Sequence, residues 1–146
     1  SGLGTYTLDG SGYLIEPSAS GFVSWKTTNS ATGQTLDQDH DGDGVSNGVE
    51  YFIGGPTGNT TGYTAVPGVT DTAGTLSVTW THAADYTGTY GTDFVVETSA
   101  TLVGAWAVEL ADPAVGFTVT FPTATQVKYT FPAGTKNFVR LKVTGP

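Results

Sequence analysis

Cysteine is absent from this 146-residue chain, and basic residues are scarce. Without cysteine there is no disulfide, no thiolate metal site and no cysteine nucleophile. Methionine is also absent, so we expect a mature or excised fragment. No run of apolar residues is long enough to cross a bilayer, which predicts that the chain has no membrane span.

The acidic residues outnumber the basic ones by 13 to 5, giving a formal charge of −8. The five bases are too few to neutralise a run of phosphates, so we do not expect a nucleic-acid partner. Much of the acidity is concentrated in one short stretch, which indicates a cation as the partner. The acids of that stretch are Asp37, Asp39, Asp41, Asp43 and Glu50.

The second half of the chain is rich in threonine and glycine and carries short alternating patterns. Threonine is β-branched and tolerates the exposed face of a sheet. Alternation at spacings near ten residues, with turn residues between, predicts a mainly β fold: an antiparallel β-sandwich, Ig-like or jelly-roll-like. The expected strands contain Leu76–Trp80, Phe94–Val96, Trp106–Val108, Phe117–Phe121, Val127–Phe131 and Val139–Val143.

In residues 18–55 the apolar residues recur at helical spacing. Phe22, Val23 and Trp25 have helical spacing after a plausible N-cap at Ser20. Val49, Phe52 and Ile53 predict a second short helix that ends at Gly54-Gly55-Pro56. We therefore expect one domain, residues 1–146, built from four parts. These are a hairpin or linker (1–17), a helix–loop–helix (18–55), a connection (56–74) and the sandwich (75–146).

The loop between the two helices reads DHDGDGVSNGVE, from Asp39 to Glu50. It matches the calcium-loop pattern D-x-[DN]-x-[DN]-G-x5-E at every specified position. Alternate residues of such a loop point inward, the glycine permits a sharp turn, and the last glutamate offers both oxygens. The expected ligands are the side chains of Asp39, Asp41, Asp43 and Glu50, the carbonyl of Val45, and Asn47 through water.

An all-oxygen ligand set favours Ca²⁺ over Mg²⁺, which requires a tighter octahedron. The alternative is a solvated turn, because Asp-Gly pairs commonly form turns. Ser46 stands where paired EF-hands usually carry an aliphatic residue, so we expect a lone, structural calcium loop and not a sensor. His40 has an outward position in the pattern, which predicts a solvent-exposed ring.

The motifs also carry a resemblance. Phe22 to Trp25, DHDGDGVSNGVEYFIGG (Asp39 to Gly55), FVVETSATL (Phe94 to Leu102), Trp106 and FVRLKV (Phe138 to Val143) occur in this order. Their order resembles a C-terminal accessory module of large secreted proteins from Planctomycetes–Verrucomicrobia bacteria, with a dockerin- or thrombospondin type-3-like loop. The resemblance implies a secreted or cell-surface location, attachment to an enzyme that acts on polysaccharides or to a surface protein, and no catalytic activity in the module itself.

Two functions remain open from the sequence. The first is a monomeric carbohydrate-binding accessory module, whose partners are a polysaccharide or surface glycan and the parent's catalytic domain. Its candidate ligand residues are Tyr86 and Tyr90, in a polar loop, and Trp106. The second is a structural or interaction module, a calcium-rigidified spacer or docking domain without glycan binding. We expect no catalytic residues: Glu97 and Glu109 lie on ordinary strand patterns, and no nucleophile motif is present.

Overall fold

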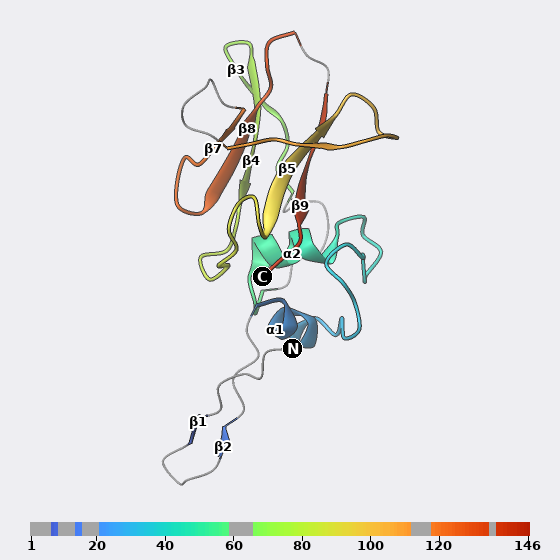
Figure 1. Ribbon diagram of the computed structural model, residues 1–146, viewed down its shortest axis with the longest axis vertical. Coiled ribbons are helices and arrows are strands. Elements are labelled where there is room, and N and C mark those ends of the chain that lie inside the picture. The colour runs from blue at the N-terminus through green and yellow to red at the C-terminus, as the bar shows by residue number, and fades with distance from the viewer. Residues whose placement is uncertain (1–6, 9–13, 16–20, 59–65, 112–117, 135–136) are drawn as a thin grey trace.

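The computed structural model describes residues 7–8, 14–15, 21–58, 66–111, 118–134 and 137–146. Two antiparallel sheets form the upper part of the molecule in Figure 1, with two short helices below them. One sheet has the strand order β3-β4-β8-β7 and the other has the order β6-β5-β9. Their bounds are β3 Thr70–Thr72, β4 Thr75–Thr81, β5 Phe94–Ser99, β6 Ala107–Val108, β7 Val119–Thr120, β8 Gln126–Thr130 and β9 Phe138–Val143. The predicted antiparallel sandwich is confirmed.

Strands β4 and β8 form the centre of the four-stranded sheet, in the register Val78↔Tyr129 and Trp80↔Val127. All four of these side chains are buried. Their alternation with threonine, serine and lysine is the period-two pattern of a sheet with one covered face. Leu76 was expected on that face, yet it is exposed, because it lies toward the end of β4 that pairs with the exposed strand β3.

The three-stranded sheet covers the opposite side of the core. Phe94, Val96, Leu141 and Val143 are buried and belong to one core cluster with the residues of β4 and β8. Strand β5 lies between β6 and β9, and all six of its residues pair with β9. This position makes β9 an edge strand.

The helices α1 (Gly21–Thr28) and α2 (Asn47–Gly54) flank the acidic loop, as predicted. Helix α2 ends before Gly55, whose φ of 72° suits a residue without a Cβ atom. Phe52 is fully buried, with its ring 5.0 Å from that of Phe94 and 4.9 Å from that of Tyr86. Helix α2 therefore closes the end of the sandwich (Figure 1), so a loop that positions α2 also supports the core.

Several expectations concern the ends and connections. A two-residue pair, β1 (Thr7–Leu8) and β2 (Leu14–Ile15), agrees with the predicted N-terminal hairpin. The expected cap Ser20 lies outside the described residues, and strand β3 was not predicted within the 56–74 connection. No helix in the described ranges is long and apolar enough to cross a membrane.

Candidate metal centre

The backbone of the acidic loop curls around its aspartates. Asp39 accepts hydrogen bonds from the backbone N–H groups of Gly42 and Gly44, both at 2.8 Å. Asp43 accepts one from Val45, also at 2.8 Å. Gly42 and Gly44 have φ values of 77° and 89°, a left-handed conformation that glycine adopts without steric cost. The curled backbone of the loop therefore requires glycine at positions 42 and 44.

The curl gathers the carboxylates. One carboxylate oxygen from each of Asp39, Asp41 and Asp43 lies within 4.8 Å of the others. Asp41 also belongs to a second group with Glu50 and His40, under the same distance limit. Asp41 thus links the exposed rim of the loop to the buried glutamate at its end.

Glu50 is the unusual member of the cluster. It is 1% exposed, and neither carboxylate oxygen accepts a hydrogen bond from a described residue. Burial, followed by the negative charges of Asp41 and Asp43, raises the pKa of Glu50 from 4.5 to about 7. A buried carboxylate without a partner is costly to a fold. A cation between Glu50 and the aspartates would remove that cost.

His40 and Asn47 connect the loop to neighbouring parts of the structure. The prediction of a solvent-exposed His40 is wrong: its side chain is 19% exposed, and its ring packs edge-on against Trp25 at 5.7 Å. Asn47 is fully buried. Its Oδ1 accepts the backbone N–H of His40 at 3.1 Å, and its Nδ2 donates to the carbonyl of Thr35 at 2.8 Å. Asn47 therefore joins the start of the loop to the segment before it, a role that the motif alone did not reveal.

The residues present fit a calcium ion. The donor set consists of carboxylate oxygens, which suit hard cations. The loop supplies three converging aspartates, and the first turn of α2 supplies the glutamate with two free oxygens. His40 Nδ1 lies 3.8 Å from Glu50 Oε2 and 3.2 Å from Asn47 Oδ1, so it faces the amide oxygen more closely than the glutamate.

The structure corrects the two tyrosine candidates for ligand binding. Tyr86 is 3% exposed and donates its hydroxyl to the carbonyl of Gly145 at 2.8 Å. Tyr90 lies between the rings of Phe94 and Phe121 and donates to the carbonyl of Glu109. Both residues come from a polar loop, but their rings fold back onto the hydrophobic core at the end of the sandwich. The Tyr86 ring is therefore buried and closed to a sugar, whereas Tyr90 is partly buried and held by its two ring contacts and its hydrogen bond.

Trp106 lies in a different setting, on the outer face of the three-stranded sheet. It is partly exposed, and the guanidinium carbon of Arg140 lies 4.1 Å from its ring centroid. Arg140 also binds Glu97 Oε2 through Nε at 2.8 Å and Nη2 at 2.7 Å. Lys142 Nζ lies 3.5 Å from the other oxygen of Glu97. Glu97 is 5% exposed beneath these two cations, although its strand pattern gave no sign of burial.

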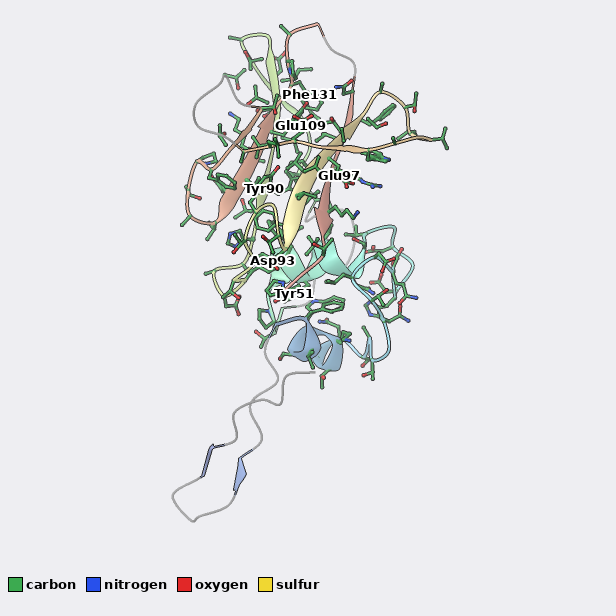
Figure 2. The ribbon with its side chains drawn as sticks, viewed as in Figure 1. Tyr51, Tyr90, Asp93, Glu97, Glu109 and Phe131 are labelled. Carbon is green, nitrogen blue, oxygen red and sulfur yellow. The ribbon has the colours of Figure 1, made fainter. Side chains whose placement is uncertain are left out.

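The remaining candidate carboxylate is also engaged. Glu109 accepts the hydroxyls of Thr98 at 2.7 Å and Thr118 at 2.8 Å, one on each oxygen. Figure 2 shows Glu97 and Glu109 on the sandwich half of the molecule, away from the helices. His82 has its Nδ1 at 2.7 Å from the carbonyl of Ala83 and its ring against Phe52. These contacts give each titratable group a structural partner.

Comparison of the chain with protein-family models, with curated proteins and with solved structures found no match.

Proposed function

We propose that the chain is a non-catalytic module whose fold is locked by one calcium ion, bound by Asp39, Asp41, Asp43 and Glu50. The observation that carries the proposal is the buried carboxylate of Glu50, which lies close to Asp41 and whose two oxygens accept no hydrogen bond from the described part of the chain. Val45 through its carbonyl and Asn47 through water complete the expected ligand set. The engaged state of Glu97, Glu109 and His82 supports a role without catalysis.

Calcium would act on the whole fold through α2. The loop is tied to the preceding segment by backbone bonds from Asn47 to Gln38 and from Gly48 to Leu36, at 2.7 and 2.8 Å. Glu50 is followed directly by Tyr51 and Phe52, which are buried in the core. An ion that binds only the folded loop stabilises the fold by mass action, by about 2.7 kcal/mol at a concentration one hundred times its Kd. Millimolar external calcium suffices for the weak affinity of extracellular modules, which agrees with the proposed secreted location.

Terbium luminescence tests the site directly. Trp25 lies against His40 of the loop, so excitation of the tryptophan should sensitise bound Tb³⁺, and calcium should displace it. Glu50→Gln and Asp41→Asn should each abolish the signal. Asp37→Asn is the matched control, because Asp37 is an exposed acid just before the loop. Equal binding by Glu50→Gln and the unaltered protein would reject the assignment.

Glycan binding is the second candidate, and Trp106 is the observation that favours it. The ring is partly exposed beside Arg140, whose charge and donors suit the hydroxyls or carboxylates of a sugar. A module of this kind would hold a secreted polysaccharide-active enzyme on its substrate.

An affinity gel with plant and algal polysaccharides in millimolar calcium tests glycan binding. Trp106→Ala should abolish retardation and leave the melting temperature unchanged, whereas Tyr86→Phe should leave retardation unchanged. If no polysaccharide retards the protein, glycan binding is rejected and the structural role is the remaining proposal.

A further inference from the structure

Strand β9 has a cleft along the edge that pairs with no other described strand. The cleft measures about 550 Å³, and one of its walls consists of five consecutive residues, Arg140 to Thr144. Successive side chains of a strand point to opposite faces of the sheet. A cleft that touches five consecutive residues therefore runs along the edge of the strand, not over one face of the sheet. Thr35, Leu36, Asp37 and Ser46 form the facing wall.

The hydrogen-bond register identifies the backbone groups that face this cleft. The N–H of Thr144 donates to the carbonyl of Asp93 at 2.7 Å, which continues the pairing of β9 with β5. Bonded and non-bonded pairs alternate along an antiparallel ladder. Arg140 and Lys142 therefore bond to β5, whereas the N–H and C=O groups of Val139, Leu141 and Val143 point to the open side.

Strand β5 confirms this assignment from its other edge. The carbonyl of Val96 accepts the N–H of Glu109 at 2.9 Å, so Val96 bonds toward β6. Its register partner on β9 is Leu141, which consequently bonds away from β5. Within the described ranges, no backbone hydrogen bond joins Val139, Leu141 or Val143 to a residue across the cleft.

Edge strands are usually guarded by charged side chains that discourage pairing. Strand β9 carries Arg140 and Lys142, but both are drawn inward over the sheet face. The Arg140 guanidinium binds Glu97 and lies over the ring of Trp106. Trp106 directly precedes β6, which is on the opposite side of β5 from the open edge of β9. Lys142 also reaches Glu97. The charges of β9 thus stabilise the face of the sheet and leave its edge open.

We propose that this edge is a docking site for an extended peptide segment of another protein, which adds as a fourth strand beside β9. The unpaired groups recur at every second residue, and an extended backbone is the structure that offers donors and acceptors at that spacing. The five residues from Arg140 to Thr144 correspond to a segment of about 17 Å. Alternate side chains of the partner would continue the buried row of Leu141 and Val143, so they should be small and apolar. The others would lie beside Lys142 and should be polar or acidic.

Amide hydrogen exchange in saturating calcium tests the free edge. We expect the amides of Leu141 and Val143 to exchange at least tenfold faster than those of Arg140 and Lys142. A peptide selected from a displayed seven-residue library, with valine or alanine at alternate positions, should then protect Leu141 and Val143. Equal protection of all four amides in the free protein would overturn the proposal, and so would a library that yields no binder.

Two variants sharpen the test. Val139→Pro removes one N–H from the open edge without removing a bond to β5, and it should weaken peptide binding at least tenfold. Val139→Thr keeps that N–H and is the control. The same peptide with N-methylated alternate amides should not bind. Protection confined to Trp106 and the outer face, or a dimer of the chain that excludes the peptide, would overturn the proposed partner.

Discussion

Replacement of Glu50 by glutamine should have opposite effects with and without calcium. In metal-free protein the carboxylate is buried and accepts no hydrogen bond from a described residue, and its pKa is raised from 4.5 to about 7. That rise corresponds to about 3 kcal/mol of unfavourable free energy once the group is ionised. Glutamine removes the charge and keeps the shape. At pH 8 in chelator, Glu50→Gln should therefore raise the melting temperature, by up to about 6–12 °C for a domain of this size.

The sign of the pH dependence gives an internal control. Because the pKa of Glu50 is higher in the folded state, the folded state binds more protons between pH 4.5 and 7, and metal-free stability should fall as pH rises through that window. At pH 4 the group is mostly protonated in both states, so the variant and the unaltered protein should melt within about 1 °C of each other. In millimolar calcium at pH 8 the order should reverse, because only the unaltered protein binds the ion.

Differential scanning calorimetry in chelator and in calcium, at pH 4 and pH 8, measures all four conditions. A variant that is less stable in chelator at pH 8, yet keeps the full calcium response, would refute the reasoning. It would mean that Glu50 has a structural partner and no role in metal binding.

Three further predictions concern the sandwich and its helices. Tyr86→Phe removes the hydrogen bond to the carbonyl of Gly145 and should lower the free energy of unfolding by about 1–3 kcal/mol in a urea titration; an unchanged midpoint would show that water replaces the bond. Arg140→Met removes both contacts to Glu97 Oε2 and leaves Lys142 as the remaining cation, so it should cost about 1–3 kcal/mol. The double variant with Glu97→Met should recover much of that loss; additive losses would contradict the pairing. Gly48→Ala places a Cβ atom 2.9 Å from a backbone oxygen and should cost about 1–3 kcal/mol, so a thermal melt without a change would place helix α2 elsewhere.

The clustering of the loop aspartates could be predicted from the sequence because it depends on local spacing. Asp39, Asp41 and Asp43 converge through alternate spacing, and Gly44 allows the turn that brings them together. Strand alternation and the glycine-ended helix are equally local, so the sandwich and both helices were predicted. The misplaced residues all depend on contacts distant in sequence. Tyr86 is covered by α2 and by the C-terminal segment, and no local pattern encodes that.

The sequence by itself determined the period of each strand, the curl of the acidic loop and the concentration of negative charge there, because each follows from residues a few positions apart. Only the tertiary structure decided which charges are buried and paired. Glu97 and Glu50 both occupy ordinary positions in their elements, yet Arg140 and Lys142 cross from β9 to neutralise Glu97, whereas the carboxylate of Glu50 has no described hydrogen-bond partner. Sheet order likewise left the edge of β9 open. Burial and pairing depend on which segments distant in the sequence meet, and local residue patterns do not encode those contacts.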